Sequence, residues 1–562
     1  MSKMISSLDK ESSVILQEKN QGNEELDSLL PTVPRPANTI CSCRYIVSYM
    51  SFFALACAYL NRVNLSVAMT AMANSTYSST YEIGVNSSAE ICPVRSNESL
   101  GEEKEGEFPW DAQTQELILA GFYYGLPLFQ IPAGLVADKY PRSTTMILCL
   151  AFLISSATNL LIPLAAYNIG ASAIIALRVI AGVAESVTYP CLYSLLSRWT
   201  PPADRSRQIS IAFAGSSAGQ IIAQPISGVL CDSDILGGWP STFYLFGTLG
   251  IIWCIPWVLL IYPSPSTHPR ISQDERDYII AELKYQNSPP KKYPWKNFAT
   301  SLPLYAVCAT DFALLWIYFS LTSNLPIFLK EALRFDITQV GILSSMPHIT
   351  FVILIMIGGS VADFILNNTP LNLTTVRKIM TTLGLLPAGA FLVLSSYVGC
   401  NAGLVITFIS LALGMTGFAY SGASLTMMEF ATPYAGMCVA IANSVATIPG
   451  FVAPLVVAVF TENQADMSGW RSFFWITFGI TVLAWLIFTI FGTSELQPWA
   501  QEVKGGNIDS SKGKYGGIHN TFSNGDVFSN GNCHKVGNIS NNSNLDHGYN
   551  SHHEKEKLMY PN

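Results

Sequence analysis

Long apolar runs separated by short polar segments dominate the chain from about residue 45 to residue 493. Each run holds about 20 residues or more, the length that an α-helix needs to cross a bilayer. The pattern predicts an all-α, polytopic membrane protein, with 208–231 and 402–428 as its weakest spans. Twelve spans are expected: 46–72, 114–137, 145–166, 171–196, 208–231, 241–262, 301–329, 339–366, 378–398, 402–428, 436–461 and 470–493.

The composition agrees with this pattern. The 562 residues are 50% hydrophobic and only 12% charged, whereas a soluble domain carries about 25% charged residues. The net charge of −7 carries little information, because the charges lie in loops and tails. We divide the chain into a disordered cytosolic N-terminal tail (1–44), a six-helix half (45–262), a cytosolic connector (263–300), a second six-helix half (301–493) and a disordered cytosolic C-terminal tail (494–562).

The orientation follows from the positive charges of the loops, which favour the cytosolic side. With both termini in the cytosol, thirteen Lys and Arg residues lie in inner loops and five in outer loops. The large loop 73–110 then faces the lumen. It carries three sequons for N-glycosylation, at Asn74, Asn86 and Asn97.

The twelve cysteines form neither a metal-binding spacing nor a disulfide framework. Cys92, Cys231 and Cys400 would share the luminal side, and one disulfide among them is an open alternative. The chain has no phosphate-binding loop, metal cluster or nucleophile–base spacing, so we expect no enzyme, no metal, no cofactor and no nucleic-acid partner. Besides its substrate, membrane lipid is the expected partner.

A short motif occurs twice. Gly134 and Asp138 end the second span in Gly-Leu-Val-Ala-Asp, and Gly359 and Asp363 end the eighth in Gly-Ser-Val-Ala-Asp, 225 residues later. The offset equals six spans and predicts two halves in parallel. The glycine would let two helices approach, and the aspartate would bind loop cations in one gating state. The alternative is ordinary helix packing beside a loop charge.

Two charged residues stand inside the fourth span. Each costs about 2.5–3.5 kcal/mol near the bilayer centre, yet Arg178 and Glu185 share nearly one helix face, seven residues apart. They are separated by roughly 10 Å along the helix axis, so each is expected to find another partner. Arg62, in the first span, lies at a depth similar to that of Arg178.

Several short motifs are distinctive in combination: 62–69 (RVNLSVAM), 130–132 (QIP), Arg178 with Glu185, 188–190 (TYP), 199–206 (WTPPADRS) and 443–450 (NSVATIPG). Through them the chain resembles the major facilitator superfamily, and within it the anion-transporter family of sialin, the vesicular glutamate transporters and the sodium–phosphate transporters. The resemblance runs from about residue 45 to residue 500 and implies a twelve-helix fold whose spans 1, 4, 7 and 10 line a central cavity.

The two arginines are the candidate anion site. A guanidinium binds carboxylate or phosphate with two parallel hydrogen bonds and keeps its charge. The alternative is that Arg62 or Arg178 only pairs with Glu185 or with backbone carbonyls. Tyr59, one turn before Arg62, and Tyr124 are added as substrate-binding candidates, because their hydroxyls could orient a polar substrate. Tyrosines 123 and 318 are similar candidates, and packing is the alternative for all four.

Glu185 is the candidate proton-coupling residue, in agreement with the resemblance. Burial and neighbouring arginines act on a carboxyl in opposite directions, so its protonation would depend on whether an anion occupies the arginines. The alternative is a structural salt bridge. Asp311, in span 7, is a second intramembrane acid and ranks behind Glu185.

The chain departs from the family at four places. Vesicular glutamate transporters carry a histidine where Leu119 stands, and an arginine in span 7, where 309–320 has none. Both absences are typical of sialin. However, sialin-like members carry a second carboxylate at the position of Ala181, and the usual Asn-x-x-Asp of span 10 ends here in Glu429.

The resulting hypothesis is proton-coupled symport of organic anions, such as sialic acid, acidic sugars or acidic amino acids, across a lysosomal or vesicular membrane. Glu25, Leu29 and Leu30 match an acidic dileucine signal that clathrin adaptors would bind. One alternative is a sodium-dependent phosphate or organic-anion cotransporter at the plasma membrane. A more distant one is a receptor or scaffold that transports nothing.

Overall fold

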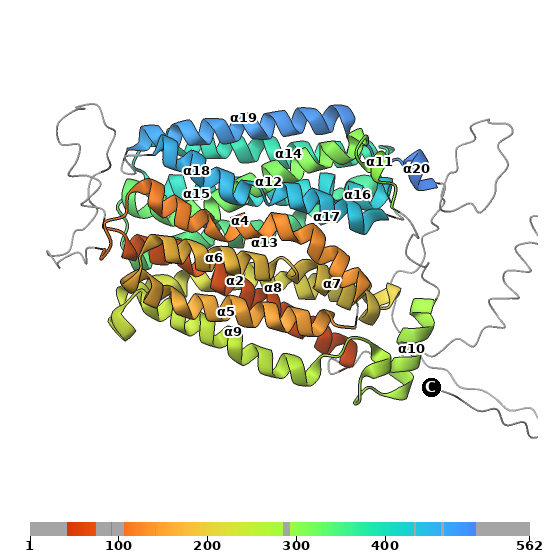
Figure 1. Cartoon of the computed structure of the whole chain (residues 1–562). Helices are drawn as coiled ribbons and strands as arrows, with labels where there is room; N and C mark the ends of the chain where they lie inside the picture. Colours follow the sequence, from red (N-terminus) through yellow and green to blue (C-terminus); the bar gives the residue numbers. More distant parts are fainter. Residues whose placement is uncertain are drawn as a thin grey trace, which may run out of the picture. The chain divides into compact units, whose positions relative to one another are not determined.

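The computed structural model describes residues 42–74, 92, 106–140, 142–284, 293–431, 434–461 and 466–501. These residues are almost entirely helical (Figure 1), and eleven spans are long and apolar enough to cross a membrane. A twelfth helix, α8 (Pro202–Asp232), is richer in polar residues and packs along the first span. The prediction of an all-α protein with twelve spans is confirmed. Outside the described residues lie Glu25, Leu29, Leu30, Asn86 and Asn97, and of Asp138 only the backbone is described.

The N-terminal half is drawn in red to yellow-green in Figure 1. Its spans are built from seven helices, because the fourth span is divided in two. They are α2 (Cys43–Met72), α4 (Ala112–Lys139), α5 (Thr144–Asn168), α6 (Ala171–Glu185), α7 (Thr188–Trp199), α8 and α9 (Pro240–Leu260).

The C-terminal half is drawn in green to blue, and its fourth and fifth spans are interrupted. Its segments are α12 (Leu302–Ile327), the π-helical turn η3 (Phe328–Ala332), α13 (Ile337–Asn368), α14 (Leu373–Ser395), α15 (Ala402–Ala419), the π-helical turn η4 (Tyr420–Ser424), α16 (Leu425–Phe430), α17 (Ala435–Ala446), α18 (Pro449–Phe460), α19 (Met467–Phe491) and the short α20 (Pro498–Gln501).

The two halves repeat one packing pattern. In the first, α4 packs on α6 and α5 on both α6 and α9; in the second, α13 packs on α15 and α14 on both α15 and α19. Between the halves, α8 packs against α13 and α4 against α18, which are again equivalent pairs. The predicted six-span repeat is therefore visible in the structure.

The two ends of the bundle differ in their cores. At the end where α2 stops and α4 starts, one cluster of buried apolar side chains combines residues of both halves, including Met69, Leu119, Leu325 and Phe328. At the opposite end each half packs its own cluster: Trp199 and Trp257 belong to the first half, Phe430 and Phe488 to the second. The halves therefore share a core at one end only.

A disulfide marks the end with the shared core. Cys92, in the segment between α2 and α4, is bonded to Cys400, between α14 and α15, with a Cα–Cα distance of 5.5 Å. Cys231 is free and buried, so the open question about the three cysteines is answered in favour of Cys92 and Cys400. We call this the disulfide end.

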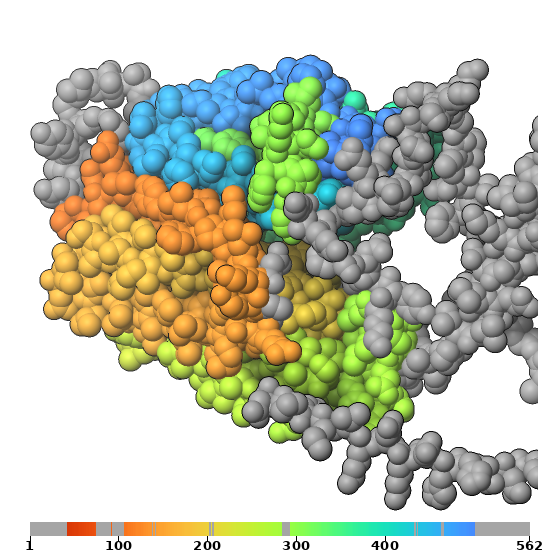
Figure 2. Space-filling view, turned by 45° about the vertical axis from the view of Figure 1, so that its right-hand side comes forward, coloured from red at the N-terminus to blue at the C-terminus, as the bar shows by residue number. Residues whose placement is uncertain are grey.

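The opposite end carries the connector helices α10 (Gln273–Lys284) and α11 (Trp295–Phe298), and we call it the connector end. Figure 2, in which this end comes forward, shows α10 on the first half and the green segment of α11 on the second. Accordingly, Ile279 is packed in the core of the first half and Phe298 in that of the second. The Glu275 carboxylate accepts hydrogen bonds from the backbone N–H groups of Cys43 and Arg44, at 3.2 and 3.1 Å, and thereby caps α2.

The glycines of the repeated motif are loosely packed in this conformation. A Cβ added to Gly134 would meet no atom within 4 Å, and at Gly359 only the hydroxyl of Ser421, at 3.9 Å. Asp363 is exposed and forms no ion pair among the described residues. In this conformation the two glycines do not bring helices together, because both motifs lie at the connector end, where the halves do not share a core. Their gating role stays a prediction for the other conformation.

Candidate functional site

The fourth span is broken at the point where its charged residues end. Helix α6 stops at Glu185, two residues follow in a turn, and α7 begins at Thr188. Pro190 lacks the N–H that would bond to the Ser186 carbonyl, which favours a break there. The Glu185 carboxylate is thereby placed at a helix end, facing α2 and α5.

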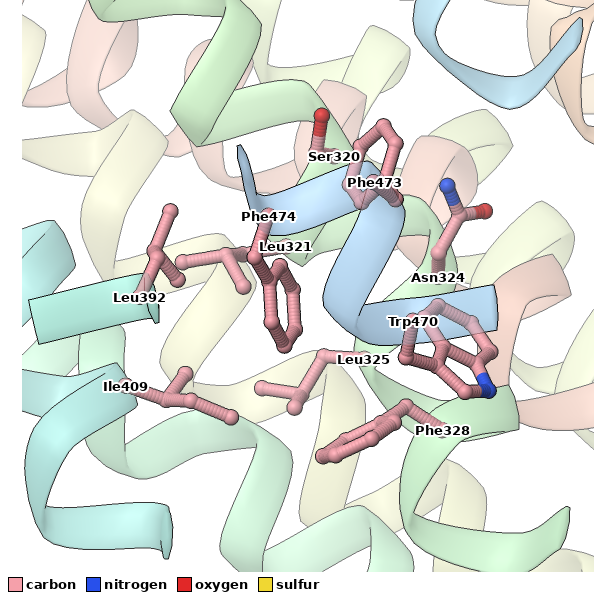
Figure 3. A pocket seen from close by; sticks show the side chains of 10 residues that line it. All are labelled: Ser320, Leu321, Asn324, Leu325, Phe328, Leu392, Ile409, Trp470, Phe473 and Phe474. Atoms are coloured by element: carbon pink, nitrogen blue, oxygen red, sulfur yellow. The ribbon is translucent and has the colours of Figure 1, made fainter. Parts of the chain in front are cut away.

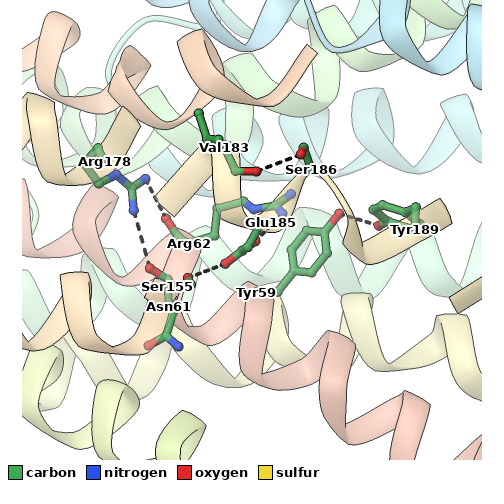
Figure 4. Close-up of polar contacts among 9 residues, drawn as sticks. All are labelled: Tyr59, Asn61, Arg62, Ser155, Arg178, Val183, Glu185, Ser186 and Tyr189. Atoms are coloured by element: carbon green, nitrogen blue, oxygen red, sulfur yellow. Dashed lines mark hydrogen bonds and ion pairs between the residues drawn. The ribbon is translucent and has the colours of Figure 1, made fainter. Parts of the chain in front are cut away.

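Glu185 is held by two neighbouring helices. Arg62, on α2, donates from Nη2 to Oε2 at 2.7 Å, and Ser155, on α5, donates from Oγ to Oε1 at 2.6 Å (Figure 4). The arginine and glutamate side chains are 5% and 1% exposed. A buried ion pair is stable only when such additional hydrogen bonds satisfy it, and removal of one partner typically costs about 3–5 kcal/mol.

Arg178 has no acidic partner among the described residues. Its two terminal nitrogens donate to backbone carbonyls of α2, at 3.4 Å to Asn61 and 3.1 Å to Arg62. Figure 4 shows the guanidinium pointing toward that stretch of α2. The expectation that Arg178 and Glu185 each find a separate partner is confirmed, and both alternatives weighed for the arginines occur, since one pairs with Glu185 and the other with carbonyls.

Aromatic rings bring the two guanidiniums together. Phe122, on α4, lies 4.5 Å from the Cζ atom of Arg62 and 5.2 Å from that of Arg178. The ring of Tyr59 lies 4.5 Å from Arg62 on the same helix, and its hydroxyl is 3.0 Å from that of Tyr189. A ring face attracts a cation, so these rings stabilise the positive charge of two arginines, of which Arg62 alone is paired with the Glu185 carboxylate in the described part of the chain.

The site contains hydrogen-bond donors that are not used by the described residues. Within the described part of the chain, the buried Nε atoms of Arg62 and Arg178 have no hydrogen-bond partner. A small cavity adjoins Arg178 and is lined by polar Asn61, Ser155 and Asn159 and by apolar Ala181, among others. Ala181, where the resemblance implies a second carboxylate, lines this cavity without a charge, so the described residues give the site two positive groups and one negative group.

The remaining candidates lie elsewhere. Tyr124 packs its ring against Phe451 of α18, at 5.5 Å. Asp311 accepts a hydrogen bond from Ser424 at 2.8 Å, within the C-terminal half. Glu429 is paired with Arg377, also within that half. None of these contacts connects them with the arginines.

Sequence reasoning missed Ser155, Asn61 and Phe122. A serine or a phenylalanine in an apolar span costs little, so nothing in the sequence distinguishes these residues from packing. Another small pocket lies in the C-terminal half between α12, α14, α15 and α19 (Figure 3). Its lining is apolar except for groups such as Ser320 and Asn324, and no charged side chain lines it.

The fold and the site define the class: a multi-pass membrane transporter of two six-helix halves, with buried charges between the helices of one half. A family model for the Major Facilitator Superfamily matches residues 51–454. The chain belongs to this superfamily, whose members are transporters and not enzymes.

The chain is similar to several known proteins over most of its length. Sialin of Homo sapiens is 35% identical over 488 residues, covering 86% of this chain and 96% of sialin. Vesicular glutamate transporter 3 of Danio rerio is 34% identical over 470 residues, covering 82% and 75%. A bacterial homolog of the human lysosomal transporter Spinster, solved in an inward-facing and unoccupied conformation, has a TM-score of 0.59 at 14% identity, covering 81% and 99%, and supports the fold alone.

Proposed function

We propose that this protein is a proton-coupled symporter of small organic anions, of the acidic sugar or acidic amino acid class. The observation that carries the proposal is the buried group of two arginines and one carboxylate, in which Arg178 has only backbone acceptors among the residues that the structure describes. An uncompensated guanidinium inside a membrane protein is costly, and a carboxylate-bearing substrate would compensate it. The names of the relatives support the same substrate class.

The coupling of proton to anion follows from the pairing of Arg62 with Glu185. With Glu185 ionised, Arg62 is occupied at 2.7 Å. A proton on Glu185 removes that pairing and leaves Arg62 free to bind the anion together with Arg178. Conversely, an anion on Arg62 releases Glu185 to take up a proton. Each ligand therefore favours binding of the other, which is the requirement for symport.

Alternating access is expected to proceed by rocking of the two halves about the site. The shared core at the disulfide end and the separate cores at the connector end support an assignment of this conformation as inward-facing. The opposite state would separate the shared core and bring the connector ends together. The repeated Gly-x-x-x-Asp motifs would then come into contact, and in that state they are proposed to act as the gate.

We further infer that the connector end faces the cytosol and the disulfide end faces a lumen. Disulfides persist in oxidising compartments, and the sequon at Asn74 falls at the same end as Cys92. The dileucine signal at Glu25, Leu29 and Leu30 supports a lysosomal or vesicular membrane. Antibody access to the C-terminal tail in cells with only the plasma membrane permeabilised checks this orientation, and protection of the tail would contradict it.

The test uses the full chain in proteoliposomes with an imposed pH gradient and labelled sialic acid or glutamate. Wild-type protein should accumulate the anion. Glu185→Gln cannot take up the coupling proton, so we expect it to lose accumulation and to retain counterflow exchange. Asp311→Asn is the matched control, since that acid is bound within the other half, and it should accumulate normally.

The rival is a sodium-dependent phosphate or organic-anion cotransporter at the plasma membrane. The same proteoliposomes separate the two, with sodium and pH gradients imposed in turn. Uptake that ignores the pH gradient and follows sodium would refute proton coupling. Unchanged accumulation by Glu185→Gln would remove Glu185 from the mechanism.

A further inference from the structure

A second buried carboxyl lies outside the arginine site. Glu116, near the start of α4 at the disulfide end, is fully buried. Its contact is Asn324, on α12 of the other half. With the amide nitrogen turned toward α4, Asn324 donates to both carboxylate oxygens, at 2.9 and 3.2 Å. Figure 3 shows Asn324 beside the apolar side chains of its own helix.

The contact bridges the two halves inside the shared core. Ile118 and Leu119 follow Glu116 on α4, and Leu321 and Leu325 flank Asn324 on α12; all four belong to the apolar cluster that joins the halves. Any opening of the disulfide end must part α4 from α12 and thereby expose Glu116 to water. The Glu116–Asn324 contact therefore exists only while this end is closed.

No described residue neutralises this carboxyl. Glu116 forms no ion pair in the described part of the chain. Phe122 lies six residues after Glu116 on α4, which places it roughly 9 Å further along the helix axis. On the neighbouring helices, Arg62 of α2 and the charged groups of α6 lie around Phe122 and not around Glu116. Helices α17 and α18 carry no charged residue, and Cys438 is their titratable side chain. Arg62 and Arg178 lie against the Phe122 ring, and Glu185 is paired with Arg62. Tyr189 is hydrogen-bonded to Tyr59. On the side of the other half, α12 and η3 carry Asp311, Tyr318, Lys330 and Glu331.

The amide of Asn324 suits either protonation state of the carboxyl. An ionised carboxylate accepts from the amide N–H₂ group, whereas a protonated carboxyl donates its O–H to the amide oxygen once the amide is turned over. Burial of an ionised carboxylate beside a neutral amide is unfavourable. The closed end therefore favours the protonated form, and the open, hydrated end favours the ionised form.

We propose that Glu116 and Asn324 form a proton-binding latch on the luminal gate, separate from the coupling residue Glu185. A proton from the lumen closes the gate, and its loss holds the gate open. The orientation rests on the proposed function, whereas the latch itself does not need a substrate. Acidification of the lumen thus promotes the step that turns a loaded transporter toward the cytosol.

The test measures closure directly and without substrate. Leu119→Cys places a thiol one turn from Glu116, inside the closed core, where its relative exposure is 3%. The full chain in nanodiscs is treated with a polar maleimide, and labelling at position 119 is quantified by peptide mass spectrometry from about pH 5 to about pH 7.5. After correction for the intrinsic pH dependence of thiol reactivity, labelling should rise by up to about tenfold per pH unit, as one linked proton requires.

Glu116→Gln keeps the shape and cannot ionise, so its corrected labelling should stay low and flat across this range. Glu107→Gln, an exposed acid at the same end, is the matched control and should keep the wild-type rise. A rise in Glu116→Gln equal to that of the wild type would overturn the latch. Because no anion is present, this result is independent of whether the proposed symport is correct.

Discussion

At the scale of single residues, Arg62 has two roles. It pairs with Glu185 at 2.7 Å, and its guanidinium lies against the same phenylalanine ring as that of Arg178. Since it can satisfy Glu185 or an anion but not both fully, it connects the proton to the substrate. Arg178 differs, because its two terminal nitrogens donate to carbonyls that hold it in place without cancelling its charge, while its Nε has no partner among the described residues.

This difference predicts that Arg178→Lys is not a conservative change. A lysine ammonium cannot donate to both carbonyls of α2 and to a substrate carboxylate in one plane. Loss of one charge-assisted hydrogen bond, worth about 1.5–3 kcal/mol, should lower anion counterflow about tenfold to a hundredfold. Arg198→Lys, outside the site, is the control and should transport normally. Equal counterflow in the two variants would contradict the anion role of Arg178.

The sequence identified the charged members of the site because charge in an apolar span is costly. It did not identify Ser155 or Phe122, whose positions depend on the rotation of α4 and α5 about their axes. It also missed Glu116, which lies two residues inside the expected span 114–137, because an acid so near the end of a span is expected to reach water. Only the packing of α4 against α12 reveals that this acid is buried.

At the scale of helices, close packing between neighbouring helices holds the site in position. A Cβ on Gly182 would lie 1.9 Å from the backbone oxygen of Phe122, so α6 and α4 are in backbone contact beside Arg178. Gly228 and Gly341 likewise bring α8 and α13 into backbone contact between the halves, where a Cβ on Gly341 would lie 2.5 Å from the backbone oxygen of Gln224. These are not the glycines of the recurring motif, because a recurring motif indicates a repeat and not which face a helix presents.

Gly182→Ala should therefore separate α4 from α6. Overpacking typically costs about 1–3 kcal/mol, and the shift moves Phe122 away from Arg178, so we expect a lower melting temperature in detergent and reduced counterflow. Gly134→Ala is the matched control, since its Cβ meets nothing within 4 Å, and its melting temperature should equal that of the wild type. Equal destabilisation of both variants would contradict the packing described for α4 and α6.

At the scale of the whole molecule, the disulfide is the covalent link between the two halves. Cys92 lies in the N-terminal half and Cys400 in the C-terminal half, 308 residues apart. The bond joins the halves at the end where they also share a core. The sequence predicted the two halves and their parallel order, because a repeat offset is visible in one dimension. It left the cysteine pairing open, since pairing depends on where loops meet in space.

A protease site introduced into the connector between Lys284 and Tyr293 tests the bond. After cleavage, the protein should run as one band without reductant and as two with it, because the bond spans the cut. Cys400→Ser should give two bands under both conditions, and Cys231→Ser, a free cysteine, should behave as the wild type. Two bands from the wild type without reductant would contradict the Cys92–Cys400 bond.

The shared arginine has an electrical consequence. The empty site holds two positive side chains and one negative one, Arg62, Arg178 and Glu185. A monovalent anion adds one negative charge, and the proton on Glu185 removes one, so the loaded site carries the same charge as the empty site. Both forms would then cross the membrane field with equal work, and the membrane voltage would neither drive nor oppose the cycle. A divalent anion with one proton would break this balance, so the voltage dependence of transport would report the valence of the substrate.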